Sequence, residues 1–215
     1  MFLFWRISMD HIWPSHLYRF LRIIEKVPLE KKILDCGAGG PRPPLALFAK
    51  YGYETHGIDI SASAIASARK YSEENQLDIN IIEGDMRKMP FDNESFSFIF
   101  SQNSICHLTK KDTKKAIDEI TRVLKPSGYC FIDFMSTESS YCGDESLGKD
   151  VGQDEYQYVD EDGDEILHCF HNDGEPDQYF TGLKVVHKIK TIAENLNRAT
   201  TDIDVRIEYY ATKVA

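Results

Sequence analysis

The sequence lacks an excess of positive charge and a long hydrophobic segment, and each absence excludes a class of protein. Its 215 residues include 25 lysines and arginines against 35 aspartates and glutamates, a formal net charge of -10. Nucleic-acid-binding proteins usually cluster basic residues against phosphates, so nucleic acid is not an expected partner. The apolar opening over residues 1–8 is too short for a membrane span and lacks the features of a signal peptide. We therefore expect no membrane span and no export.

Paired cysteines are also missing. The five cysteines stand singly, with no CxxC pair and no spacing typical of a zinc site or a disulfide framework. Seven acidic residues cluster between Asp154 and Glu165, but Gly163 comes too early for a calcium-binding EF loop, which favours a solvated turn. We predict reduced thiols, a cytoplasmic protein and no metal site.

Helix and strand signals alternate from about residue 12 to residue 135, which is typical of an α/β domain with a parallel sheet. A helix is expected over about 12–25, because Leu17, Phe20, Leu21 and Ile24 have the spacing of one apolar face. Strands are expected at 31–36, 53–59, 78–85, 95–102 and 129–135, and helices at 45–52, 62–71 and 112–124. The length suits a single domain over residues 1–215, with a helical lead-in at 1–30.

The composition changes after Met135, where serine, threonine, glycine and acidic residues become frequent. We interpret about 136–180 as an insertion that caps the active site, with a hairpin turning at Asp162-Gly163 and a strand at 166–170. Two further strands, at 183–192 and 204–213, are close enough in sequence to form an antiparallel pair.

A glycine-rich loop follows the first strand in KILDCGAGGPRPP. Asp35 ends the strand, and Gly37, Ala38 and Gly39 bring backbone close to a ligand without a bulky side chain. A dinucleotide loop would need a third glycine where Arg42 stands. A carboxylate beside the loop also suits a cationic sulfonium or amino group better than a pyrophosphate. The loop therefore favours S-adenosylmethionine over NAD.

Two more acidic residues end the next two strands. Asp59 stands 24 residues after Asp35, where a carboxylate accepts hydrogen bonds from ribose hydroxyls, and Ser61 is the expected N-cap of the following helix. Asp85 follows the third strand and can accept from an adenine amine. The candidate cofactor residues at these two strand ends are Asp59, Ile60, Ser61, Gly84, Asp85 and Met86, with Ile60 and Met86 as apolar contacts for the ring.

These residues resemble the class I S-adenosylmethionine-dependent methyltransferases, in particular the small-molecule group of the ubiquinone/menaquinone biosynthesis type. The resemblance runs through LDCGAGG, HGIDIS, GDMRKMPF, SFSFIFSQNSICHL, EITRVLKPSGY and FIDF, about half of the chain. It implies a Rossmann-like three-layer sandwich whose seven-stranded, mostly parallel sheet has an antiparallel last strand. It also implies transfer of a methyl group from S-adenosyl-L-methionine to a small molecule, with S-adenosyl-L-homocysteine as the product. One departure is Ser97, where family members usually have aspartate.

The resemblance also places Ser101 and Gln102 beside the methionine part of the cofactor, with Asn103 facing the substrate. Methyl transfer can proceed through alignment alone, and a base is needed only where the acceptor must lose a proton. Four side chains suit that role by residue type: His107, His168, His171 and Tyr179. His107 is the best placed of these, after the fourth strand. The expected substrate contacts are Tyr18, Asn103, His107 and Tyr179.

Other functions remain open at this point. An aminopropyltransferase of the same fold would favour additional carboxylates where Gln102 and Asn103 stand. A non-catalytic S-adenosylmethionine-binding module would have less reason to keep Asp35, Asp59 and Asp85 together. The sequence predicts neither the acceptor nor whether the chain is a monomer or a homodimer.

Overall fold

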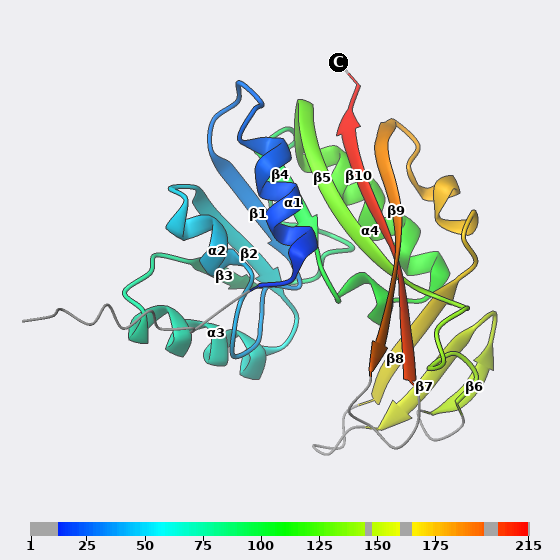
Figure 1. Cartoon of the computed structure of the whole chain (residues 1–215). Helices are drawn as coiled ribbons and strands as arrows, with labels where there is room; N and C mark the ends of the chain where they lie inside the picture. The colour runs from blue at the N-terminus through cyan, green and yellow to red at the C-terminus, as the bar shows by residue number, and fades with distance from the viewer. Residues whose placement is uncertain (1–12, 145–147, 160–164, 196–201, 215) are drawn as a thin grey trace, which may run out of the picture.

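The computed structural model describes residues 13–144, 148–159, 165–195 and 202–214, which form a twisted sheet with helices on both faces (Figure 1). Five parallel strands lie in the order β3-β2-β1-β4-β5. Their bounds are β1 Lys32–Cys36, β2 Glu54–Asp59, β3 Asn80–Glu83, β4 Phe96–Ser101 and β5 Leu124–Ser136. Because the strands are parallel, the segments that follow them meet at one edge of the sheet.

The sheet continues beyond β5 with β10 (Asp202–Lys213) and then β9 (Leu183–Asn195), the reverse of their order in the chain. β10 lies antiparallel between β5 and β9. The last strand of the chain is therefore the antiparallel one, as the resemblance implied. The predicted antiparallel pair at the end of the chain is confirmed, although most of the connection between β9 and β10 lies outside the described residues.

Helices cover the sheet on both faces and make three layers. One face carries α1 (Ser15–Ile24), α2 (Leu45–Lys50) and α3 (Ala62–Glu74). The other carries α4 (Lys110–Val123) and the short 3-10 segment η3 (Glu175–Tyr179). The predicted three-layer α/β sandwich is confirmed.

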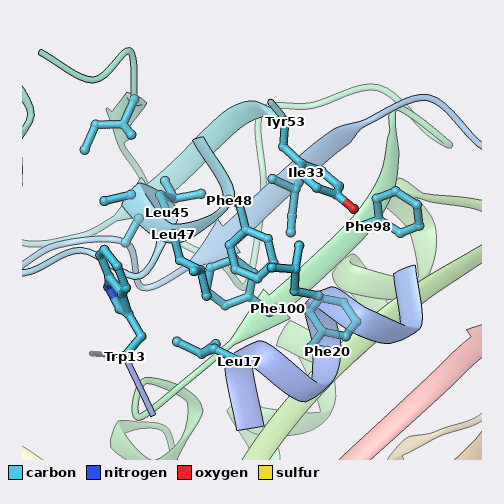
Figure 2. Packing of buried hydrophobic residues seen from close by; sticks show 14 of the residues in the cluster. Trp13, Leu17, Phe20, Ile33, Leu45, Leu47, Phe48, Tyr53, Phe98 and Phe100 are labelled. Carbon is cyan, nitrogen blue, oxygen red and sulfur yellow. The ribbon is translucent and has the colours of Figure 1, made fainter. Parts of the chain in front are cut away.

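The first helix shows how apolar spacing positions an element. Leu17, Phe20, Leu21 and Ile24 are all buried against the sheet, as their spacing predicted. Figure 2 shows Phe20 beside Phe48 of α2 and Phe100 of β4. The ring centroids of Phe48 and Phe100 are 4.9 Å apart, and Phe20 lies 6.2 Å and 6.5 Å from them. Such aromatic pairs each add about 0.5–1.5 kcal/mol beyond the area they bury, which fixes α1 over β4.

Several predicted boundaries differ from the structure. α3 runs to Glu74 instead of residue 71, β3 is confined to four residues, and β5 begins at Leu124 directly after α4. The predicted N-cap is confirmed, because Ser61 Oγ accepts from the amide of Ala64 at 3.2 Å. Residues 1–12, the start of the expected lead-in, lie outside the described residues.

The segment after β5 forms a small antiparallel sheet at the carboxyl end of that strand (Figure 1). It consists of β6 (Lys149–Gly152), β7 (Glu155–Val159) and β8 (Glu165–His171). β8 was predicted, and it continues the main sheet through a short parallel contact in which Met135 faces Phe170. β7 pairs antiparallel with β8, as the predicted hairpin requires, although its turn at Asp162-Gly163 lies outside the described residues, and β6 was not predicted.

Candidate functional site

A cavity of about 460 Å³ opens at the carboxyl edge of the parallel strands. Its walls come from the segments after β1, β2, β3 and β4 and from the 3-10 turn η1 (Ile105–His107). Pockets for small ligands usually measure ~300–1,000 Å³, and open α/β sheets bind ligands at this edge. The wall includes nine residues that the sequence analysis assigned to a site: Gly37, Gly39, Asp59, Ile60, Gly84, Asp85, Met86, Asn103 and His107.

The loop after β1 brings bare backbone to the cavity. Gly37 has a φ of +96°, and a Cβ at this position would lie 2.1 Å from Ser104 Oγ. A Cβ on Gly39 would lie 2.8 Å from Asp59 Oδ2. The two glycines therefore let the loop contact the segments after β4 and β2 at distances that no side chain would allow.

Asp59 ends β2, and two backbone amides fix its carboxylate. The amide of Gly39 donates to Oδ2 at 2.8 Å and the amide of Ser61 donates to Oδ1 at 2.9 Å. A carboxylate oxygen has two acceptor positions, so each oxygen retains one. Because Asp59 also lines the cavity, its carboxylate is oriented and able to accept from hydroxyl groups of a ligand.

Asp85 follows β3 and is paired with Arg87. The guanidinium Nε of Arg87 donates to both carboxylate oxygens at 2.9 Å, and its Nη1 lies 2.7 Å from Asp112 Oδ2. The hydrogen bonds from Arg87 lower the pKa of Asp85 below its usual range. Arg87 lines the cavity too, and Ile60, which is 69% exposed, and Met86 add apolar surface at the same end. This part of the cavity wall therefore combines the apolar surface of Ile60 and Met86 with the Asp85–Arg87 ion pair.

Asp35 lies fully buried at the end of β1 and is not part of the cavity wall. Within the described residues, neither of its carboxylate oxygens has a hydrogen-bond partner. Burial, followed by the charge of Asp59, raises the pKa of Asp35 well above its usual range. A cationic group placed near this carboxyl would favour its ionised form, in line with the charge argument made from the sequence.

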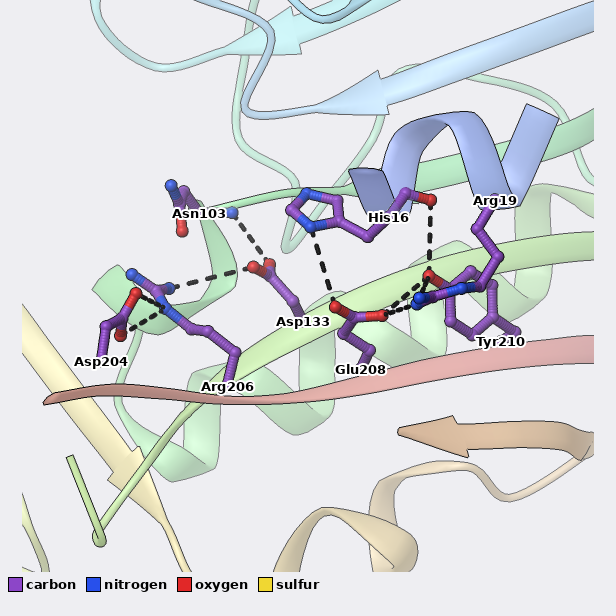
Figure 3. A network of polar contacts seen from close by, with 8 residues as sticks. All are labelled: His16, Arg19, Asn103, Asp133, Asp204, Arg206, Glu208 and Tyr210. Carbon is purple, nitrogen blue, oxygen red and sulfur yellow. Dashed lines mark hydrogen bonds and ion pairs between the residues drawn. The ribbon is translucent and has the colours of Figure 1, made fainter. Parts of the chain in front are cut away.

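The end of β4 is anchored to both neighbouring strands. The Ser101 hydroxyl is buried and donates to the carbonyl of Cys36 at 3.0 Å. Asn103 has a φ of +54°, which is uncommon for a residue other than glycine, and its amide donates to Asp133 Oδ1 at 2.9 Å (Figure 3). Asn103 lines the cavity, whereas the half-buried Gln102 and the buried Ser101 do not.

His107 lies exposed at the rim of the cavity, in η1. Its Nδ1 is 2.9 Å from the carbonyl oxygen of Leu167 in β8. Because a carbonyl only accepts, Nδ1 carries the proton of this hydrogen bond. The ring of His168 lies 5.3 Å away, and burial, followed by the charge of His107, lowers the pKa of His168 to about 4. His107 therefore connects the rim of the cavity to β8.

Besides Asp35, Ser101 and Gln102, the predicted residues Tyr18, Ala38, Ser61 and Tyr179 also lie away from the cavity wall. Tyr18 packs half-buried against the core beneath α1. Tyr179 is buried, and its hydroxyl lies 3.5 Å from Nε2 of the fully buried His171. Ala38 is buried within the loop, and Ser61 contributes through its amide rather than through the cavity wall.

The wall also contains residues that the sequence analysis did not select, namely Gly40, Ile58, Ala64, Arg87, Ser104 and Leu108. Arg87 and Ser104 stand within two residues of predicted positions, in motifs already identified, so proximity in sequence was the available signal. Leu108 directly follows the predicted His107, so the same signal was available for it.

The fold and the cavity define a doubly wound α/β protein with a nucleotide-type pocket at the carboxyl edge of its sheet. Residues 34–132 match the family described as a methyltransferase domain. The structure is similar to that of an S-adenosylmethionine-dependent methyltransferase from Methanosarcina mazei, with a TM-score of 0.73 and 21% sequence identity, covering 94% of this chain and 98% of that one. Residues 34–132 are therefore similar to a methyltransferase domain, and the fold is that of S-adenosylmethionine-dependent methyltransferases of known structure.

Curated relatives of the chain are methyltransferases named for different acceptors. The chain is 35% identical over 133 residues to 24-methylenesterol C-methyltransferase 3 of Arabidopsis thaliana, which covers 60% of this chain. It is 31% identical over 136 residues to sarcosine/dimethylglycine N-methyltransferase of Aphanothece halophytica, again 60% of this chain. The matches span 36% and 48% of those two relatives. The chain therefore matches less than half of the length of either relative.

Two further observations concern cysteines and membrane spans. All five cysteines are free thiols, and four of them are buried. Among the residues that the structure describes, no helix has the length and apolarity needed to cross a bilayer.

Proposed function

We propose that this protein transfers the methyl group of S-adenosylmethionine to a small-molecule acceptor. The observation that carries the proposal is the cavity at the strand ends, which is lined by Gly37, Gly39 and Gly40, by the oriented Asp59 carboxylate and by the exposed Ile60. Together these groups suit a ligand with a charged tail, a ribose and a flat ring.

The residues fit the cofactor on several independent points. Asp59 keeps one free acceptor position on each oxygen for the two ribose hydroxyls. Ile60 and Met86 offer apolar surface to adenine beside Asp85. The buried, unpartnered carboxylate of Asp35 suits the cationic methionine part. When bound, the cofactor supplies an electrophilic methyl group on a sulfonium. The role of the protein is to orient this group and to exclude water from it.

The segment 136–180 caps the acceptor side of the cavity in this proposal. Its β8 is connected to the cavity rim through the His107–Leu167 hydrogen bond. Lys110, at the start of α4, pairs with Glu175 at 2.6 Å and with Asp154 at 3.4 Å, so α4, η3 and the small sheet are held together by charge. This segment is where we expect the acceptor to be selected, with Asn103 and His107 on the facing wall.

Isothermal titration calorimetry with S-adenosylhomocysteine tests the proposal. We expect micromolar binding, and a weakening of at least about tenfold in Asp59→Ala, because a hydrogen bond to a charged group contributes roughly 1.5–3 kcal/mol. Asp78→Ala is the matched control, since Asp78 is exposed before β3 at the opposite edge of the sheet. Equal binding of NADH, or no binding of either ligand, would contradict the proposal.

Transfer itself needs a separate assay, because binding alone is also expected of a non-catalytic module. Labelled S-adenosylmethionine incubated with panels of hydroxyl, amine and carbon acceptors distinguishes these functions and an aminopropyltransferase. The ubiquinone-type acceptor and a cytoplasmic location remain predictions from the sequence, the second supported by the five free thiols. Sedimentation of the purified protein distinguishes a monomer from a homodimer.

A further inference from the structure

A second cavity, of about 550 Å³, lies between α1 and the strands at the end of the sheet. None of its described lining residues belongs to the cofactor cavity. Figure 1 shows α1 beside β5 and β10, with β9 beyond them, whereas α2 contacts β2, and α3 contacts β2 and β3. Among the described residues, α1 is therefore the last helix on this face, and the surface of β9 beside it has no covering helix.

Half-buried apolar side chains form the floor of this second cavity. Ile23 and Val27 come from α1 and the turn after it, Tyr129 comes from β5, and Ile189 comes from β9. All four pack against the main hydrophobic core, while part of each side chain stays in contact with water. An apolar group that covered them would release this water, which the hydrophobic effect favours.

The rim of the same cavity is positively charged. Arg19 and Arg22 stand three residues apart on α1, so they share one face of the helix. Lys26 joins them, because the turn after α1 continues the coil, with the amide of Lys26 donating to the carbonyl of Ile23 at 3.3 Å. His187 of β9 completes the rim from the side of the sheet. The described residues that line the cavity include no aspartate or glutamate.

Two cations of the rim have no counter-charge. Arg19 is neutralised by the buried carboxylate of Glu208, 2.6 Å away (Figure 3). Arg22 and Lys26 are exposed and take part in no ion pair within the part of the chain that the structure describes. An anion in the cavity would therefore meet two cations that are available to it.

Other roles of these residues leave the floor unexplained. A cation in the last turn of a helix interacts favourably with the helix dipole, and Arg22 has that position. Glu25 is close to the cations in the sequence, but its charge acts on Tyr53, where it follows burial in raising the pKa of the hydroxyl to about 12. Neither role accounts for the uncovered apolar surface beside the cations.

The floor and the rim together select the chemistry of a ligand. A bare inorganic anion would leave the apolar floor in water, and a neutral apolar molecule would leave Arg22 and Lys26 unpaired. A nucleic acid needs a broad basic surface, which a chain with a net charge of -10 does not favour. The volume falls in the range of ~300–1,000 Å³ that small ligands occupy. The cavity therefore fits a small molecule that joins an apolar body to an anionic group.

We propose that the second cavity is a binding site for a small organic anion. The apolar body of this ligand packs on Ile23, Val27 and Ile189, and the ring of Tyr129 offers it an aromatic surface. Its charged group pairs with Arg22 and Lys26 at the rim. Because the site is separate from the cofactor cavity, this inference does not rest on the proposed function.

Binding of 2-naphthoate to the full chain tests the site, with the neutral 2-naphthamide as the matched ligand. Methyl NMR follows Ile23, Ile189 and, in the cofactor cavity, Ile60, and an isoleucine-to-valine variant assigns each signal. We expect 2-naphthoate to shift the Ile23 and Ile189 signals saturably, and to bind at least about threefold more tightly than 2-naphthamide. Equal affinity for the two ligands, no shift at Ile23 and Ile189, or a shift at Ile60 alone would overturn the proposal.

A double variant, Arg22→Gln with Lys26→Gln, tests the role of charge. Its dissociation constant for 2-naphthoate should rise at least about threefold, because the ion pairs are lost. Unchanged binding of 2-naphthamide should show that the cavity is intact. Lys70→Gln with Lys111→Gln is the matched control, since it removes the same charge from exposed positions on α3 and α4. Unchanged 2-naphthoate affinity in the first variant, or an equal loss in the control, would refute the anion site.

Discussion

Gly39→Ala should damage both the stability and the cofactor site through a single methyl group. The added Cβ would lie 2.5 Å from the Cβ of Ala64 and 2.8 Å from Asp59 Oδ2, well inside contact distance. No left-handed φ is recorded for Gly39, so backbone strain does not contribute and the effect comes from crowding. Overpacking of this kind costs roughly 1–3 kcal/mol. Any displacement of α3 also lengthens the 2.8 Å bond from the Gly39 amide to Asp59.

Thermal unfolding followed by circular dichroism measures the first effect, and calorimetry with S-adenosylhomocysteine measures the second. For a chain of this size 1 kcal/mol corresponds to about 2–4 °C in Tm, so a decrease of roughly 2–12 °C is expected. The cofactor product should bind at least about tenfold more weakly. Gly174→Ala is the control, because Gly174 has a negative φ and open space where the Cβ would stand. A Gly39→Ala protein with wild-type Tm and affinity would refute the steric reasoning.

Three other changes give distinct expectations. Arg87→Gln removes the guanidinium whose hydrogen bonds lower the pKa of Asp85. A lowered pKa stabilises the folded protein above the unfolded pKa of the carboxyl, and this contribution is lost on acidification. The variant should be less stable than wild type at pH 7, and the difference in urea unfolding should shrink below about pH 4. Asp35→Asn removes a carboxyl whose folded pKa is raised by burial. Such a carboxyl destabilises the fold increasingly as the pH rises above its unfolded pKa. The unfolding free energy of the variant should therefore increase relative to wild type between pH 4 and pH 8, and a constant difference would contradict this. Arg122→Lys loses the pair of hydrogen bonds to Glu119 and the hydrogen bonds to the main-chain carbonyls of Met89 and Phe91. Chemical denaturation should show a loss of about 1–3 kcal/mol in the free energy of unfolding. An unchanged denaturation midpoint would show that the segment between β3 and β4 does not need these bonds.

The elements that the sequence predicted well are those buried on one face or on both. The spacing of the buried residues in α1 and the uninterrupted apolar run of β4 each match one periodicity. β6 escaped prediction because it is exposed along its whole length and its four residues show no apolar alternation. Its strand conformation depends on pairing with β7, which is information that lies outside the segment.

The candidate site divides in the same way. Asp59 and Asp85 were predictable because each follows a recognisable strand, and parallel strands bring their ends together. The contacts of His16 and Arg19 with Glu208 were not predictable. Glu208 lies far from both residues in the sequence, where it is an ordinary polar position in a strand. Only the pairing of β10 with β5 brings these residues together.

The place of β10 in the sheet also sets an order of assembly during synthesis. The loops that line the cavity are synthesised before β5, whereas Arg206 and Glu208 are synthesised only after β9. Until β10 inserts between β5 and β9, β5 has an open edge, and His16 and Arg19 of α1 lack their contacts with Glu208. A nascent chain can thus form the walls of its cavity while the edge of β5 is still open, so the cavity and the complete sheet form at different times.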